Sequence, residues 1–400
     1  MIGILGLLVM LAIAYALSID RSAIAWRTVG AGLGLQFVFA LLILKTRGGE
    51  YFFDKARVLA TRFLDFNDAG AAFIFGENFT EHYFAFKVLT TIIFFSSFIT
   101  VLYHFGIVQL VVRAFAVVMM KLLGTSGAES LSASGNIFVG QTEAPLLIRP
   151  YISKMTQSEL LAVMTGGMAT VAGGVLAAYV GMGVSAGHLI AASVMSAPAA
   201  LVMAKIMVPE TEESMTAGKV TLDVELPYVN VIDAAAQGAG DGLKLALNVG
   251  AMLLAFLGLI ALVNGAILGP LGGLFGFEGL SLELLLGWLF APLAFVMGVP
   301  WNEAVSVGSL LGIKTAANEF LGYIELQAMM EAGTLSERSQ VIATYALCGF
   351  SNFSSIAIQI GGIGPIAPER KQDLARLGIR ALIGGTLACF QTATIAGLLL

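Results

Sequence analysis

The chain has 400 residues, of which 58% are hydrophobic and only 12% are charged, with a mean hydropathy of +0.89 and a net charge of −5. Soluble domains carry about 25% charged residues, so the composition excludes an ordinary soluble protein, and long unalternating apolar stretches favour helices over a membrane β-barrel. No basic block suggests binding to nucleic acid, and the two cysteines, Cys348 and Cys389, both lie in apolar segments and indicate neither a disulfide framework nor a metal site.

Taken in order, the apolar stretches predict an all-α integral membrane protein with eight transmembrane helices. Each approaches or exceeds the roughly 20 residues that a bilayer requires. The predicted spans are residues 1–18, 28–45, 88–112, 159–182, 186–208, 242–269, 340–363 and 376–400. The first resembles a signal peptide, but its charges follow the apolar run instead of preceding it, so we expect a retained helix.

Two further segments are polar enough to lie outside the spans. Residues 50–66 mix Phe and Leu with Asp and Arg, which predicts an amphipathic helix at the membrane interface. Residues 209–230 are acidic and polar, and we expect them to form a loop that divides the chain into two halves.

An interrupted apolar segment at residues 125–150 contains the most informative stretch, Asn136–Pro145. A carboxylate at membrane depth, such as that of Glu143, costs roughly 2.5 to 3.5 kcal/mol and therefore indicates a functional site. Gly140 and Pro145 predict a broken backbone, which lipid tolerates only where the backbone lines a cavity or is buried in protein. We therefore expect a re-entrant hairpin whose tip carries a solute site.

A second interrupted segment, residues 281–323, contains Gly298–Ala304 and repeats the pattern of Gly, Pro and Glu-Ala. Each predicted hairpin is followed by a span with a small or polar middle, at Gly166–Gly174 and at Cys348–Ser355, where we expect the helix to unwind at the membrane midplane. A hairpin, a broken helix and a further helix, occurring twice, are typical of a secondary transporter with its site between two repeats.

The distribution of Lys and Arg predicts the orientation. More of these residues face the cytoplasm if the N-terminus lies outside, which the positive-inside rule favours. Eight spans then place both termini outside, and the two hairpins enter from opposite sides. The repeats are therefore predicted to be inverted.

The polar groups at membrane depth favour a neutral, hydroxyl-rich substrate. Lys314 is the only basic residue well inside a hairpin, so an anionic substrate is disfavoured, whereas carboxylates accept hydrogen bonds from hydroxyls. Gln141 and Asn352 both donate and accept, which suits an amide-like edge, and a sugar attached to a heterocycle has both features. The acidic residues at this depth are Glu129, Glu143, Glu303 and Glu319.

The same acceptors also suit a cation. Unwound carbonyls and the C-terminal ends of half-helices form hard-cation sites, and either sodium or a proton could serve. The residues that could meet around such an ion are Asn136, Val139, Thr170 and Val171.

The stretch Asn136–Pro145 resembles the signature of the concentrative nucleoside transporters. The resemblance covers essentially the whole chain in order and continues through Gly166–Gly174, Asn248–Met252, Gly298–Ala304, Ala317–Phe320 and Cys348–Ser355. Sodium-coupled members carry Gln-Thr-Glu-Ala-Pro in the hairpin, as this chain does at 141–145. The resemblance therefore favours the bacterial, sodium-coupled branch over a proton-coupled carrier, which remains the alternative; a cation channel comes next, and an enzyme is not expected.

The resemblance implies a homotrimer in the cell inner membrane that imports nucleosides by an elevator motion. It implies a scaffold of residues 1–124 and 209–270, the latter including the loop and the sixth span, and a transport domain of residues 125–208 and 271–400. Sodium is the implied coupling ion, held by Asn136, Val139, Thr170 and Val171, and no other cofactor is implied. The implied substrate-binding residues are Gln141, Thr142, Glu143, Val175, Leu245, Glu319, Phe350, Asn352 and Ser355.

Several questions stay open at this point. Glu143 could serve only as a helix cap, since a carboxylate is stabilised at a helix N-terminus. The roles of Glu129, Glu303 and Lys314, the base and sugar preference, the coupling stoichiometry and the resting conformation are not predicted.

Overall fold

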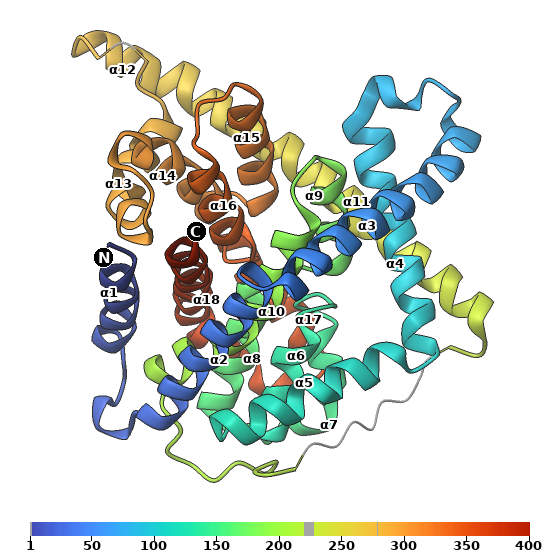
Figure 1. The fold of residues 1–400 in the computed structure, drawn as a ribbon, viewed down its shortest axis with the longest axis vertical. Helices are drawn as coiled ribbons and strands as arrows, with labels where there is room; N and C mark the ends of the chain where they lie inside the picture. Colours follow the sequence, from blue (N-terminus) through green and yellow to red (C-terminus); the bar gives the residue numbers. More distant parts are fainter. Residues whose placement is uncertain (1, 220–227, 278) are drawn as a thin grey trace.

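The structure is a computed structural model that describes residues 2–219, 228–277 and 279–400 (Figure 1). Every regular element in these ranges is a helix, which confirms the all-α prediction. Long helices cross at varied angles around a central group that includes α8, α10 and α18 (Gln157–Ala169, Ala186–Met207 and Lys371–Leu399). These central helices are rich in small and apolar residues on all sides, so they can be enclosed by protein.

The N-terminal part contains five long helices. They are α1 (Ile2–Ala16), α2 (Trp26–Leu44), α3 (Arg47–Phe75), α4 (Leu89–His104) and α5 (Ile107–Leu123). The predicted amphipathic segment lies within α3, which begins where the Thr46 side chain accepts a hydrogen bond from the Gly49 amide. The predicted span 88–112 is wrong at its end, because Gly106 adopts a positive φ of 77° and the chain turns there between α4 and α5.

The next part contains the first predicted hairpin and the helices that follow it. In chain order it comprises α6 (Gly127–Gly135), η4 (Ala144–Ile148), α7 (Arg149–Ile152), α8, α9 (Gly173–Gly181) and α10. The backbone is irregular between α6 and η4, where the sequence predicts a tip. The predicted span 159–182 is broken between α8 and α9, as expected from its small and polar middle.

The C-terminal part begins with α11 (Val231–Leu262), η5 (Val263–Leu268), α12 (Gly269–Leu274) and α13 (Leu282–Met297) and then repeats this order from α14 (Trp301–Ala316) onward. The elements after α14 are α15 (Glu319–Glu331), α16 (Glu337–Leu347), α17 (Phe353–Ile363), η6 (Pro368–Arg370) and α18. The helix pair α14 and α15 corresponds to α6 and η4, and the break between α16 and α17 corresponds to that between α8 and α9. In both halves the helix before the tip packs against the helix that is later broken, α6 on α8 and α14 on α16.

The second interrupted segment has a break at the predicted place and a further break that was not predicted. The turn at Gly298–Pro300 joins α13 to α14 at an angle of 117°, but the next break, at Ala317–Asn318, is the one that leads into the buried Glu319. Glu303 instead accepts hydrogen bonds from the amide (3.1 Å) and hydroxyl (2.9 Å) of Ser336. Glu303 lies in the first turn of α14 and Glu319 is the first residue of α15, so nearly the whole of α14 separates the two acids along the chain.

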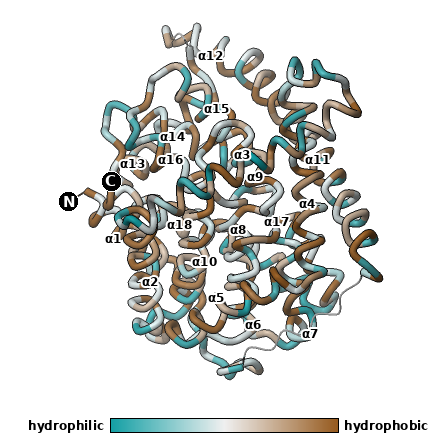
Figure 2. Tube along the Cα trace, turned by 45° about the vertical axis from the view of Figure 1, so that its right-hand side comes forward, coloured by the Kyte–Doolittle hydropathy of each residue, from teal (hydrophilic) through white to brown (hydrophobic). Residues whose placement is uncertain are grey.

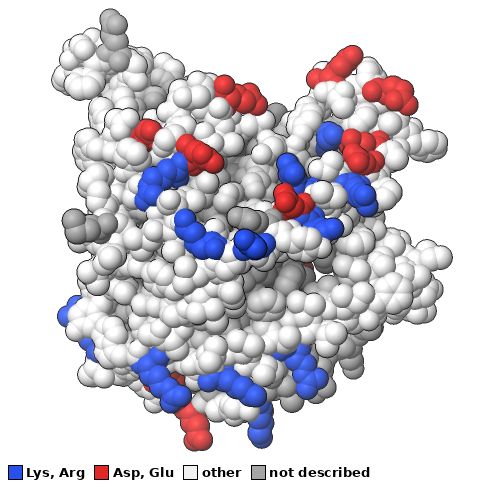
Figure 3. Space-filling view, in the orientation of Figure 1, with Lys and Arg blue, Asp and Glu red and all other residues white. Residues whose placement is uncertain are grey.

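Six helices in the described ranges are long and apolar enough to cross a membrane, or seven if α13 and α14 form one bent span. The eight predicted spans also counted α1, which has only 15 residues, and residues 340–363, which are interrupted between α16 and α17. Figure 2 shows that apolar residues dominate the middle of most helices. On the face shown in Figure 3, Lys and Arg dominate the lower edge, whereas most visible acidic residues lie in the upper half.

The longest apolar run is the least enclosed. Residues Val231–Leu274 form 44 continuous helical residues through α11, η5 and α12 (yellow in Figure 1), and only 6% of the most apolar window is buried. The run crosses α4 closely, because a Cβ atom at Gly242 would lie 2.8 Å from the Cα of Ile93. This crossing joins two elements of the predicted scaffold.

Candidate functional site

The two broken helices touch each other at their breaks. The backbone amide of Phe350 donates to the carbonyl of Thr170 over 3.1 Å, which joins the break after α16 to the break after α8. A Cβ atom at Gly349 would lie 2.9 Å from the carbonyl oxygen of Met168, so glycine permits this approach of two backbones. The crossing places polar groups from both halves of the chain in one region.

The first tip docks on the same region. The carbonyl of Phe138 accepts from the Gly173 amide over 3.2 Å, which ties the tip to the first residue of α9. A Cβ at Gly173 would lie 2.8 Å from that oxygen. The irregular backbone at 136–143 therefore has hydrogen-bond partners in protein, which irregular backbone at membrane depth requires because lipid offers none.

Gln141 links the first tip to the second broken helix. Its Nε2 donates to the Ser355 hydroxyl over 3.2 Å, and its Oε1 accepts from Gln359 Nε2 over 3.1 Å. Gln359 also donates to the Met164 carbonyl over 2.9 Å, so the side chain of Gln359 is anchored to α8 and fixes the orientation of the Gln141 amide. Sequence reasoning did not identify Gln359, which lies within an apolar helix without a flanking polar signal.

Glu319 is the buried carboxylate at the break between α14 and α15, and it contacts the same broken helix as Gln141 does. It is the first residue of α15, is 4% exposed, and accepts from the Tyr179 hydroxyl over 2.9 Å and from Asn352 Nδ2 over 3.1 Å. Asn352 also caps α17, because its Oδ1 accepts from the Ser355 amide over 2.9 Å. Tyr179 was not predicted from the sequence either, because a single tyrosine in an apolar helix has no polar neighbours in sequence that would indicate a role in binding.

The remaining predicted substrate-binding residues surround these groups. Thr142 is half-buried and contacts α17, since a Cβ at Gly362 would lie 2.5 Å from its methyl group. Glu143 is exposed, and its carboxylate folds back over Gly140, where a Cβ would lie 2.2 Å from Oε2. Val175 is buried in α9, while Phe350 and Leu245 are half-buried and pack against the core.

The predicted cation-binding residues include an unpaired buried oxygen. Asn136 is fully buried, and its Nδ2 donates to the Ser132 carbonyl over 3.0 Å, but its Oδ1 has no hydrogen-bond partner among the residues that the structure describes. A Cβ at Gly166 would lie 3.4 Å from Asn136 Nδ2, so this side chain rests against α8 one turn before its end at Ala169. An amide oxygen at the C-terminal ends of α6 and α8 fits a hard monovalent cation.

The other three predicted cation ligands are Val139, Thr170 and Val171. Val171 is buried, Val139 is half-buried, and the Thr170 hydroxyl is already committed to the Gly166 carbonyl over 2.9 Å. Thr170 could therefore contribute its backbone carbonyl, which accepts from Phe350 and has a second lone pair. Within the described ranges no group of three His, Cys, Asp or Glu side chains could hold a metal ion.

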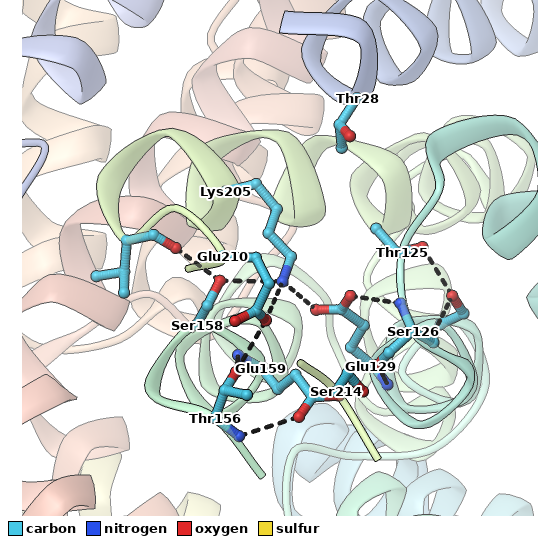
Figure 4. A network of polar contacts seen from close by, with 12 residues as sticks. Thr28, Thr125, Ser126, Glu129, Thr156, Ser158, Glu159, Lys205, Glu210 and Ser214 are labelled. Atoms are coloured by element: carbon cyan, nitrogen blue, oxygen red, sulfur yellow. Dashed lines mark hydrogen bonds and ion pairs between the residues drawn. The ribbon is translucent and has the colours of Figure 1, made fainter. Parts of the chain in front are cut away.

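A separate buried network lies at the N-terminal ends of α6 and α8 (Figure 4). The Lys205 ammonium forms ion pairs with Glu129 at 2.8 Å and Glu210 at 3.3 Å and donates to the Ser158 hydroxyl over 3.0 Å. Glu129 also accepts from the Ser126 amide in a capping box. Through these contacts Glu129 anchors the start of the first predicted hairpin to α8 and α10.

Family models match almost the whole chain in three consecutive parts. Residues 5–78 match the N-terminus of Na+ dependent nucleoside transporters, residues 85–186 match a model for nucleoside recognition, and residues 188–397 match the transporter C-terminus. The chain belongs to the Na+ dependent nucleoside transporter family. The resemblance inferred from the sequence is thus confirmed, and members of this family are transporters, not enzymes.

The transporter has similar relatives in bacteria and mammals. It is 50% identical to an uncharacterized transporter of Haemophilus influenzae, covering 99% of this chain and 97% of that protein. It is 46% identical to solute carrier family 28 member 3 of Mus musculus over 98% of this chain, but spans only 58% of that relative. Sodium/nucleoside cotransporter 1 of Mus musculus is 43% identical over 100% of this chain and 64% of that relative.

Solved structures share the fold. The transporter is 47% identical to CNTnw in an inward-facing substrate-bound state, with a TM-score of 0.94, covering 100% of this chain and 97% of that chain. A CNTnw variant in an outward-facing state gives the same TM-score at 46% identity, covering 100% of this chain and 97% of that chain.

Proposed function

We propose that this chain is a secondary active symporter that imports nucleosides by using a sodium gradient. The single observation that carries the proposal is the polar cluster where the two tips and the two broken helices meet: Gln141 with Ser355, and Glu319 with Asn352. In this cluster an amide can pair with a nucleobase edge, while a carboxylate and hydroxyl can bind sugar hydroxyls. A small neutral solute with both features is a nucleoside.

The roles follow from the side-chain chemistry. Gln141, Thr142 and Glu143 contact the nucleobase, with Val175 packed beside it. Glu319, Asn352 and Ser355 bind the ribose, Phe350 lines the pocket, and Leu245 faces it from α11. Tyr179 and Asn352 each donate to one oxygen of the Glu319 carboxylate, so they orient this acceptor before the solute arrives and leave its other lone pairs for the ribose hydroxyls.

Sodium is the proposed coupling ion, and the unpaired Oδ1 of Asn136 supports it. Val139, Thr170 and Val171 would complete the site with Asn136. One sodium ion moving down about 100 mV and a tenfold gradient supplies roughly 2.3 plus 1.4 kcal/mol, enough for several-hundred-fold accumulation of a neutral solute. A proton-coupled carrier is the alternative, and it would not need the Asn136 oxygen.

The proposed architecture completes the mechanism. Residues 1–124 and 209–270 form a scaffold, and residues 125–208 and 271–400 form a transport domain that slides past it as an elevator. We propose a homotrimer in the cell inner membrane, with both termini outside. The lower edge rich in Lys and Arg in Figure 3 then faces the cytoplasm, in agreement with the positive-inside rule.

The test is uptake of radiolabelled uridine into proteoliposomes under an inward sodium gradient, a proton gradient or neither. We expect accumulation only with sodium, and Asn136→Ala should require a higher sodium concentration for half-maximal uptake. Accumulation driven by protons alone would contradict sodium coupling. Failure to transport uridine or adenosine under any gradient, in folded protein, would contradict the proposed function itself.

A further inference from the structure

Lys314 is a buried charge that the proposed binding sites do not use. Its side chain is 0% exposed, and its Nζ donates to the backbone carbonyl of Ala346 over 2.7 Å. No carboxylate forms an ion pair with it among the residues that the structure describes. Burial of an unpaired ammonium is costly, so the surroundings must supply a compensating negative potential.

Two helix C-termini supply that potential together with the Glu319 carboxylate, which interacts with the Lys314 charge without forming an ion pair. Lys314 lies in the last turn of α14, which ends at Ala316, and Ala346 lies in the last turn of α16, which ends at Leu347. Each helix C-terminus carries about half a negative charge on its free carbonyls. The ammonium therefore links two ends that would otherwise meet in a low-dielectric interior without a counter-charge.

The first half presents the same pair of ends without a basic side chain. There α6 ends at Gly135 and α8 ends at Ala169, and Asn136 lies between them with its Oδ1 unpaired. No Lys or Arg occurs at 127–148 or at 157–172. This is the place where the proposed function puts sodium.

We propose that the Lys314 ammonium is an internal cation that takes, in the second half, the position that sodium takes in the first. The proposal rests on the proposed sodium site at Asn136. It makes Lys314 a positioning residue: it holds the end of α14 to the end of α16 permanently, and so fixes Glu319, five residues later, relative to Asn352. Only the first half then assembles in response to sodium, and one sodium ion accompanies each nucleoside.

The experiment compares three variants of the full-length protein in detergent. Thermal stability without nucleoside is titrated with sodium chloride against choline chloride at constant ionic strength, and uridine affinity is measured at saturating sodium. Lys314→Ala leaves space for an ion, Lys314→Met fills the space without charge, and Lys314→Arg keeps the charge as the matched control.

We expect wild type to show one sodium-binding event. Lys314→Ala should gain a second one, so that the Hill slope rises from about one toward two. Lys314→Met should keep the wild-type slope and lose uridine affinity by about tenfold, whereas Lys314→Arg should stay within about twofold of wild type. A lysine that serves only packing would not change the slope of the sodium titration.

Three results would overturn the proposal: an unchanged slope in Lys314→Ala, wild-type affinity in Lys314→Met, or equal losses in Lys314→Arg and Lys314→Met. If the Ala and Met variants do not fold, the reversal potential of wild-type uptake decides instead. One charge per nucleoside supports the internal cation, and two charges overturn it. If sodium stabilises the wild-type protein but the protein transports no nucleoside, only the proposed function is refuted. The sodium titration of Lys314→Ala would still test the role of Lys314.

Discussion

Two single side chains, Tyr179 and Asn352, orient the Glu319 carboxylate as a hydrogen-bond acceptor for a solute. Each of its oxygens accepts from a different element, Tyr179 on α9 and Asn352 at the start of α17. Two donors keep the carboxylate oriented and partly compensate the cost of burying it. Its remaining lone pairs can then meet hydroxyl groups without rearrangement.

Replacing Glu319 by Gln tests this role. The substitution keeps the shape but replaces one acceptor oxygen by a donor that faces Tyr179 or Asn352. A charged hydrogen bond contributes about 1.5 to 3 kcal/mol, so the KM for uridine should rise by at least tenfold. Tyr179→Phe, which preserves the carboxylate, should have a smaller effect; an unchanged KM in Glu319→Gln would remove Glu319 from the site.

The residue types of the site were predictable, but their partners were not. Polar side chains at helix breaks, such as Gln141, Asn352 and Ser355, are conspicuous in an apolar sequence because polar groups are costly at membrane depth. Tyr179 and Gln359 lie inside apolar helices, and only the folded structure brings them within hydrogen-bonding distance of Glu319 and Gln141. Their function depends on contacts between residues more than 130 positions apart, which no local pattern encodes.

At the scale of elements, the break between α8 and α9 contacts the break between α16 and α17 through the hydrogen bond from the Phe350 amide to the Thr170 carbonyl. Small and polar residues in the middle of an apolar span predicted both breaks. The further break at Ala317–Asn318 was not predictable in the same way, because Gly298 and Pro300 are stronger signals of a turn than Ala317 and Asn318. The Gly-Pro turn ends α13 beside Arg338, which donates to the Gly298 carbonyl over 3.0 Å.

The contact between the breaks can be tested by adding one methyl group. In Gly349→Ala, the Cβ would lie 2.5 Å from the Cys389 sulfur and 2.9 Å from backbone atoms of Met168 and Ala169. Overpacking of this kind costs about 1 to 3 kcal/mol, so the thermal unfolding temperature should fall. Gly361→Ala is the control, because no atom of the described part of the chain lies within 4 Å of a Cβ placed there, and Ala favours helix more than Gly does. Equal stability of the two variants would contradict the close contact.

At the scale of the whole molecule, the proposed elevator motion requires α9 to move against α4. A Cβ at Gly174 would lie 3.1 Å from the Ser96 hydroxyl, so paired cysteines at these positions are near disulfide distance. In Ser96→Cys Gly174→Cys, oxidation should stop uridine uptake, and reduction should restore it. The native Cys348 and Cys389 are buried and should not react.

The matched control places both cysteines within the proposed scaffold. Ser97→Cys Ala235→Cys joins α4 to α11, where the Ser97 hydroxyl donates to the Ala235 carbonyl over 2.9 Å. Oxidation of this pair should leave uptake unchanged. Uptake that survives the link between α4 and α9 would contradict movement of a transport domain against the scaffold.

The exposed helical run Val231–Leu274 has a consequence for the lipid around the protein. The part without charged residues, 245–274, extends about 45 Å at 1.5 Å per residue, whereas the hydrocarbon core of a bilayer is about 30 Å thick. An apolar excess of this size is accommodated by inclination of the helix or by local thickening of the membrane. Acyl-chain length then becomes a physical variable of transport, because a change in thickness alters the inclination of the very helix that crosses α4.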